Sequence, residues 1–165
     1  MKKIVTVFLV YLLLSSSLFS MIRLSCDPTE SKITFRSKIL SMLEVKGSFD
    51  AISVDIDLID TQKIDQINVR IDTNSIDTNN KTRDRDLRGT KFFNSVKFPF
   101  ITFSVNEIVD ITQKNVTGYL VVNSIKKEVT IPVEMQYFKN EGTNQYVLSV
   151  KSEEFVINRR DFKVS

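Results

Sequence analysis

The residues with the greatest capacity for chemistry form one charged run in the middle of the chain. Residues 83–88 read Arg-Asp-Arg-Asp-Leu-Arg. The planar guanidinium group of arginine suits phosphate and carboxylate ligands. Arg85 and Arg88 are therefore candidates for binding the anionic head group of a ligand. Arg83 and Asp84 are expected to have a structural role instead, in which they pair with neighbours and pin the run to the rest of the fold.

The composition excludes most catalytic sites. The chain contains no histidine and a single cysteine, Cys26. Nucleophilic Ser–His or Cys–His pairs and zinc sites made of histidine and cysteine therefore cannot be built. Asp55, Asp57 and Asp60 form an acidic cluster, but the glycine and the ligand spacing of a calcium loop are missing. We expect no enzyme activity, no catalytic residue, no metal site and no catalytic cofactor.

Residues 1–25 have the pattern of an export signal. Lys2 and Lys3 precede an apolar run over residues 4–14, and a serine cluster follows. The apolar run is too short to span a bilayer comfortably. The formal charge of the whole chain is +3, and without Lys2, Lys3 and Arg23 the rest is neutral, which gives no argument for nucleic-acid binding. The mature domain, residues 26–165, is expected in the periplasm or cell envelope.

Two modes of processing are compatible with the end of this segment. The tripeptide ending at Cys26, Leu-Ser-Cys, resembles a bacterial lipobox, although Arg23 stands where an aliphatic residue is usual. A lipidated Cys26 would associate the protein with a membrane. The alternative is ordinary cleavage after Ser17 or Ser20, which would leave Cys26 as a free thiol. The sequence favours neither mode.

Apolar and polar residues alternate with a period of two through most of the remaining chain. The alternation is clearest over residues 45–59, where Ile52, Val54 and Ile56 share one face. Similar segments occupy residues 33–35, 64–72, 101–109, 116–122, 129–138 and 146–157. About eight β segments with short connections predict an all-β domain, an eight-stranded antiparallel barrel. The longer insert between Asp72 and Ile101 is expected to be partly helical and to close one end of the barrel with phenylalanines.

The order of several short motifs gives the chain a family resemblance. The motifs are Ile71-Asp72, Ser75-Ile76, Thr78, Arg83-Asp84, Leu87, Phe92-Phe93-Asn94, Phe98-Pro99, Ile101-Thr102-Phe103, residues 45–49, residues 116–120 and Arg160-Asp161-Phe162. Together they resemble the YceI-like family, bacterial periplasmic lipid- and polyisoprenoid-binding proteins with a lipocalin-like barrel. One departure is Asp86, which stands where the family usually has a histidine, so no role of that histidine is carried over.

The resemblance implies that the barrel carries a long apolar chain, with a polyisoprenoid or isoprenoid quinone as the expected ligand. An eight-stranded barrel either fills its interior with side chains or holds one small ligand. For a lined cavity, the candidate ligand-binding residues near the entrance are Phe92, Phe93, Phe98 and Phe103. The alternative is a filled barrel that acts as a non-catalytic envelope interaction or stress-response module. A homodimer is compatible with either interpretation.

Overall fold

The structure, a computed structural model, describes residues 22–27, 31–39 and 43–164. Most of the predicted export segment, residues 1–21, lies outside the described residues. The four residues after it form a β-strand, so the described fold begins before Cys26. Within the described residues, no helix has the length and apolar composition needed to cross a membrane.

The first half of the fold contains three long strands, each interrupted once. In chain order their halves are β1 (Ile22–Ser25), β2 (Ile33–Ile39), β3 (Leu43–Phe49), β4 (Ile52–Leu58), β5 (Lys63–Asp72) and β6 (Ile76–Asp77). All three interruptions lie at the boundary between two sheets. On one side of it, β1 and β5 flank β4 in the main sheet; on the other, β2 and β6 flank β3 in a smaller sheet. The predicted strand over residues 45–59 is therefore divided at Asp50 and Ala51.

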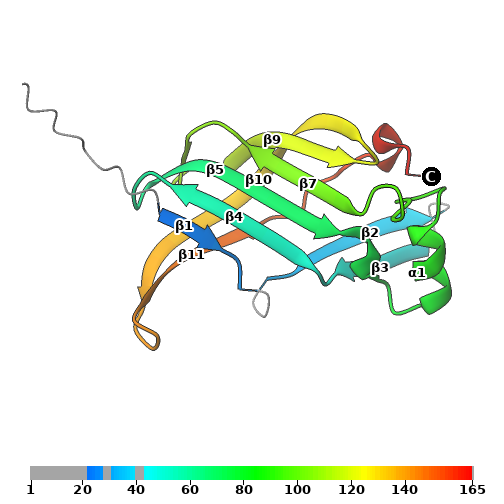
Figure 1. The fold of residues 1–165 in the computed structure, drawn as a ribbon, viewed down its shortest axis with the longest axis horizontal. Coiled ribbons are helices and arrows are strands. Elements are labelled where there is room, and N and C mark those ends of the chain that lie inside the picture. The colour runs from blue at the N-terminus through cyan, green and yellow to red at the C-terminus, as the bar shows by residue number, and fades with distance from the viewer. Residues whose placement is uncertain (1–21, 28–30, 40–42, 165) are drawn as a thin grey trace, which may run out of the picture.

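The second half is an antiparallel meander. Its strands are β7 (Phe100–Val105), β8 (Val109–Asp110), β9 (Asn115–Val122), β10 (Ile125–Asn140) and β11 (Gln145–Ser152). The main sheet has eight strands in the order β1-β4-β5-β7-β9-β10-β11, with β8 paired to β5. The sheets curl into a nearly closed barrel (Figure 1). The predicted fold class, an antiparallel barrel with a short helical insert, is confirmed.

The strand β10 pairs with two different strands along its length. Its first half pairs with β9 as far as Pro132, which lies opposite Asn115. From Val133 onward it pairs with β11. Proline has no N–H group to donate to a ladder, so Pro132 is well suited to the point where the partner changes. The second half of β10 and β11 form a hairpin at the end of the barrel opposite α1 (Figure 1).

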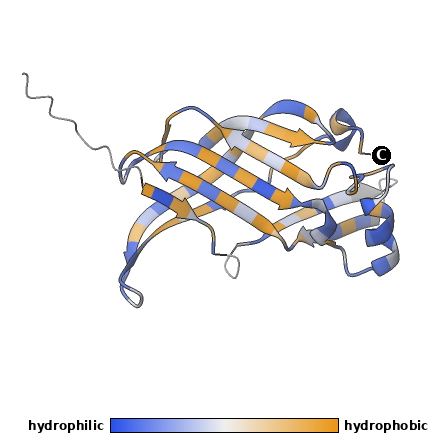
Figure 2. Cartoon of the chain, in the orientation of Figure 1, coloured by the Kyte–Doolittle hydropathy of each residue, from blue (hydrophilic) through white to orange (hydrophobic). Residues whose placement is uncertain are grey.

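One face of the central strands is apolar and turns toward the interior. On β7, Ile101, Phe103 and Val105 are buried, whereas Thr102 and Ser104 are half-buried. Figure 2 shows the same alternation of hydrophobic and hydrophilic residues along β4, β5 and β7. The period of two in the sequence therefore identifies the interior face of the barrel.

The helical insert and the C-terminus lie at the same end of the barrel (Figure 1). The helix α1 (Lys81–Arg88) follows β6, and Asn80 caps it by accepting a hydrogen bond from the Arg83 N–H at 3.0 Å. The last predicted strand ends at Ser152, earlier than expected. Residues 153–158 have no regular structure and lead into a 3-10 turn at Arg159–Phe162.

Candidate functional site

The charged residues Arg83 and Asp84 hold α1 against the chain that precedes it. Asp84 is 5% exposed and accepts hydrogen bonds from the Thr78 N–H at 3.0 Å and the Thr78 hydroxyl at 2.5 Å. Arg83 donates from Nε to the same hydroxyl at 2.8 Å and from Nη2 to the Thr78 carbonyl at 2.7 Å. Both side chains therefore surround Thr78, which is 3% exposed, and their contacts are structural.

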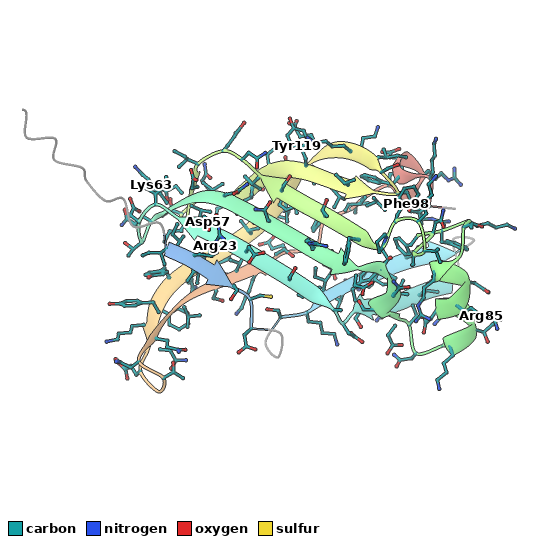
Figure 3. All side chains as sticks on the ribbon, in the orientation of Figure 1. Arg23, Asp57, Lys63, Arg85, Phe98 and Tyr119 are labelled. Carbon is teal, nitrogen blue, oxygen red and sulfur yellow. The ribbon has the colours of Figure 1, made fainter. Side chains whose placement is uncertain are left out.

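The other two arginines of the run are used differently from each other. Arg88 donates to two backbone carbonyls, that of Asn74 at 3.0 Å and that of Ile76 at 3.1 Å. Arg85 points away from the barrel (Figure 3) and lies 3.9 Å from the Asp86 carboxylate, a weak surface contact. The guanidinium of Arg88 is thus occupied, and Arg85 is remote from the interior. Their predicted role in ligand binding stays a prediction.

The aromatic pair after α1 closes the adjacent end of the barrel. Phe92 and Phe93 are half-buried and pack against the core. The ring of Phe93 meets that of Phe49 edge-on, with 5.7 Å between centroids. The carbonyl of Phe92 accepts a hydrogen bond from Asn123 Nδ2 at 2.7 Å. The role of the pair at the entrance to a ligand cavity stays a prediction.

The remaining two candidate phenylalanines occupy different places. Phe103 is 8% exposed and belongs to the core, in the middle of β7. Its ring lies over Gly118 of β9, where an added Cβ would come within 2.7 Å of Phe103 Cζ. Gly118 therefore makes room for the ring. Phe98 is half-buried, and its ring has Lys97 Nζ 5.2 Å from its centroid; it is not among the described side chains that pack on the core.

The core of the barrel is apolar, and many of the side chains that pack on it are only half-buried. Register places Val54, Val69 and Phe103 opposite one another across β4, β5 and β7. Phe103 is buried, whereas Val54 and Val69 are only half-buried. Other half-buried side chains that pack on the core are Leu24, Ile33, Phe35, Ile52, Ile125, Val129, Ile131, Val133, Tyr137 and Leu148. These side chains therefore keep part of their apolar surface accessible.

Two polar atoms in the described part of the chain are buried without a hydrogen-bond partner, and both lie near the aromatic pair. They are Ser95 Oγ and Asn123 Oδ1. Asn123 also connects the turn after α1 to the C-terminus, because its Nδ2 donates to the carbonyls of Phe92 at 2.7 Å and Phe162 at 3.3 Å. An unpaired buried polar atom costs free energy. These two atoms therefore lower the stability of this end of the barrel.

Sequence reasoning did not single out Asn123 as a functional residue. The feature of the sequence that could have identified it is its place in a tight turn: Asn123 and Ser124 connect two strands where glycine is usual. Both residues adopt positive φ, 50° and 62°. Asparagine tolerates this conformation better than most residues. The side chain is thereby directed from the β9–β10 turn toward the two carbonyls that it joins.

The residues around Cys26 belong to the sheet. Register pairs β1 with β4 from Ile22 opposite Leu58 to Ser25 opposite Asp55. Arg23 donates two hydrogen bonds to Asp57, at 2.8 and 3.1 Å, and the two side chains lie together in Figure 3. These hydrogen bonds lower the pKa of Asp57, against the opposing effect of its desolvation. Cys26 follows directly, half-buried, and its N–H donates to the Val54 carbonyl at 3.0 Å.

Comparison with known proteins agrees with this architecture. A UPF0312 protein of Yersinia pestis (strain Pestoides F) is 39% identical over 106 residues, which cover 63% of this chain and 53% of that protein. The matched stretch therefore spans about half of this curated relative. The crystal structure of a Campylobacter jejuni YCEI protein superposes with a TM-score of 0.66 at 27% identity, covering 84% of this chain and 82% of that one.

A more distant structural neighbour shares the fold. A polyisoprenoid binding domain from Saccharophagus degradans superposes with a TM-score of 0.52 at 16% identity, covering 72% of this chain and 78% of that one. The YceI-like domain matches residues 24–165, a range that begins inside β1 and includes every later strand, α1 and the C-terminal turn. The chain therefore belongs to the YceI-like family.

Proposed function

We propose that this protein binds a long apolar chain, a polyisoprenoid or an isoprenoid quinone, along the interior face of its barrel. The observation that carries the proposal is the lining: apolar side chains from most strands face inward, and many are only half-buried. A barrel of this size can hold one small ligand. The polyisoprenoid binding domain among the structural neighbours supports the choice of ligand class.

The energetics suit a carrier. Each buried CH₂ group contributes about 0.8 kcal/mol, so an isoprene unit is worth about 3 kcal/mol when fully covered. A long chain that was completely buried would exceed the practical ceiling of about 18–21 kcal/mol for non-covalent binding. A lining of half-buried side chains would cover the ligand only in part, and this weaker binding would allow the ligand to exchange.

The proposal is tested by extracting lipid from the protein purified from its native host and identifying it by mass spectrometry. Val129→Asp places a carboxylate on the half-buried interior face of β10, opposite Gly118, and should abolish co-purified isoprenoid. Phe103→Asp places the carboxylate in the buried core and should also lower the thermal midpoint severely. The matched control is Ser104→Asp, next to Phe103 on the opposite face of β7, which should keep the lipid. Wild-type protein that never carries an isoprenoid would overturn the proposal.

We also propose export to the periplasm or cell envelope, with cleavage before Ile22. Cleavage at Cys26 would remove β1 and leave Asp57, which is 6% exposed, without the two hydrogen bonds from Arg23. The pairing of β1 therefore favours ordinary cleavage over lipidation of Cys26. The mass of the mature N-terminal peptide tests this: a peptide that begins at an acylated Cys26 would contradict it.

A further inference from the structure

The closing segment, residues 153–157 directly after β11, has the residue pattern of a strand. The alternation of the sequence predicts that the last strand continues to Ile157, and the side chains still alternate in exposure after β11 ends. Val156 is 98% exposed, whereas Phe155 and Ile157 on either side of it are 38% and 39% exposed. A period of two in exposure is typical of an extended strand with one sheltered face.

The closing segment lacks the hydrogen bonds that accompany such a pattern. Within the described residues, the one backbone hydrogen bond that it forms runs from the Glu153 N–H to the Pro132 carbonyl, at 3.1 Å. Residues 154–157 belong to no ladder. Phe155 and Ile157 are also not among the described side chains that pack on the core. The segment therefore has the composition of a strand without the ladder or the apolar contacts that stabilise one.

The closing segment lies between β2 and β10. On one side, its first residue donates to the carbonyl of Pro132 in β10. On the other side, Glu154 forms an ion pair with Arg36 of β2. β2 is the outermost strand of the smaller sheet, so the edge that it turns away from β3 has no strand partner among the described residues. The segment therefore crosses the seam at which the barrel is nearly closed (Figure 1).

The interior side chains beside this seam are less covered than those in the middle of the main sheet. Ile33 and Phe35 of β2 and Val129 and Ile131 of β10 pack on the core but are only half-buried. On β7, the central strand of the main sheet, the interior residues are buried. The gap in the ladder thus coincides with a less covered part of the interior.

The ion pair indicates how the closing segment would sit if it paired with β2. Arg36 is exposed and adjoins Phe35, which packs on the core, so Arg36 lies on the outer face of β2. Its partner Glu154 is then on the outer face as well. Because successive side chains of a strand point to opposite faces, Phe155 and Ile157 would turn toward the interior. An exposed ion pair is weak, so it keeps the segment near β2 without fixing it there.

We propose that the closing segment is a gate in the barrel wall. It pairs with β2 as the last strand when an apolar chain fills the interior, and it unpairs to let that chain enter and leave. An occupied interior favours the paired state because Phe155 and Ile157 then bury their side chains against the ligand. This inference rests on the proposed function and adds the route by which the ligand exchanges.

Hydrogen exchange measured by mass spectrometry tests the gate on the mature, delipidated protein. The probe is geranylgeraniol, an isoprenoid alcohol. Without it, the amides of residues 154–157 should exchange as fast as those of an exposed loop. With it, their exchange should slow by about tenfold, together with that of amides on the free edge of β2. Equal exchange at residues 154–157 with and without the alcohol would overturn the gate.

Val156→Pro prevents the pairing without disturbing the fold. The Val156 side chain is 98% exposed, and within the described structure its N–H donates no hydrogen bond to the backbone. Proline supplies no N–H for a ladder. The variant should bind geranylgeraniol without slower exchange at Phe155 and Ile157. It should also release the alcohol to phosphatidylcholine vesicles at least about threefold faster than the wild type. Val156→Ser, which keeps the N–H, is the matched control and should behave as the wild type.

A charge swap tests the side of the seam that faces β2. Glu154→Arg places a cation against Arg36 and should speed the release of geranylgeraniol by about threefold. Adding Arg36→Glu to this variant restores an ion pair of reversed polarity and should restore the rate. Glu153→Arg is the control with the same net charge, because Glu153 forms no ion pair within the described residues. Equal rates for Glu154→Arg and Glu153→Arg would contradict the contact with β2.

The outcomes separate the gate from the function on which it rests. If geranylgeraniol binds, but neither protects residues 154–157 nor leaves the Val156→Pro variant faster than the wild type, the gate is overturned and the apolar-chain function stands. If the folded protein does not bind geranylgeraniol, both proposals fail. If residues 154–157 are already protected in the delipidated protein, the seam is permanently closed and the gate is overturned.

Discussion

The two basic segments of this protein, α1 and the C-terminal turn, have similar sequences and opposite uses. In α1, Arg83 donates to Thr78, and Arg88 donates to two backbone carbonyls. In the C-terminal turn, Arg159 and Arg160 line a hollow, and their guanidinium groups have no partner within the described residues. Charged side chains of α1 are thus used within the fold, whereas those of the C-terminal turn are presented to solvent.

The largest effect should come from the buried acid of α1. Asp84→Ala removes the acceptor for both the N–H and the hydroxyl of Thr78, which is 3% exposed. Leaving these groups unpaired should lower the free energy of unfolding by about 3 kcal/mol, measured by urea denaturation. The neighbouring exposed residue supplies the control, since Asp86→Ala should change stability by less than about 0.5 kcal/mol. Similar losses for both variants would contradict the structural role of Asp84.

A smaller loss should distinguish the two arginines near the end of α1. Arg88→Ala removes two hydrogen bonds to backbone carbonyls and should cost about 1–2 kcal/mol in the free energy of unfolding. Arg85→Ala, at the protein surface, should cost less than about 0.5 kcal/mol. A larger loss for Arg85→Ala than for Arg88→Ala would contradict the structural role assigned to Arg88.

In the C-terminal turn, one substitution should stabilise the protein instead of destabilising it. Lys163→Gly relieves a left-handed conformation worth about 1–2 kcal/mol and adds about 0.5–1 kcal/mol of glycine entropy cost, so a net gain of about 0.5 kcal/mol is expected. Lys163→Ala is the control: it removes the same charge but keeps a Cβ at positive φ, so it should give no gain. Equal thermal midpoints for the two variants would show that the backbone is unstrained.

The smallest expected effect on stability comes from the ion pair between Arg23 and Asp57. The pKa of Asp57 is lowered in the folded state, so its contribution to stability is present above about pH 4 and is lost as the pH falls through the lowered value. The drop in urea midpoint between pH 7 and pH 3 should therefore be smaller in Asp57→Asn and in Arg23→Gln than in the wild type. The same drop in all three proteins would contradict the pairing.

Much of the fold could be predicted because it depends on local patterns. The alternation that places Phe103 inside also places Thr102 and Ser104 on the other face of β7, and both follow from a period of two. The polar insert was predicted to be partly helical, and α1 is that helix. The breaks that divide β3 from β4 were missed, because they depend on the pairing of strands that are distant in sequence.

The site was less predictable for the same physical reason. Arg85 and Arg88 have the same side chain and lie in the same helix. Which of them forms hydrogen bonds depends on where the carbonyls of Asn74 and Ile76 lie in the fold, and these accept from Arg88. Arg159 and Arg160 lie near the end of the sequence, where a pair of cations is commonly a solvated surface feature. The sequence does not reveal that the buried Phe162 and Val164 anchor the turn that carries these two arginines.

The connectivity of the strands also orders the steps by which the barrel forms. Most strands pair with partners close to them along the chain, as β10 does with β9 and β11. Such contacts close short loops and form quickly. Other contacts close longer loops: the bond from Asn123 Nδ2 to the Phe162 carbonyl joins residues 39 positions apart, and the pairing of β5 with β8 joins Lys63 to the more distant Asp110. Contacts that close long loops cost more chain entropy, so the end of the barrel that Phe162 completes is expected to form later than the hairpins.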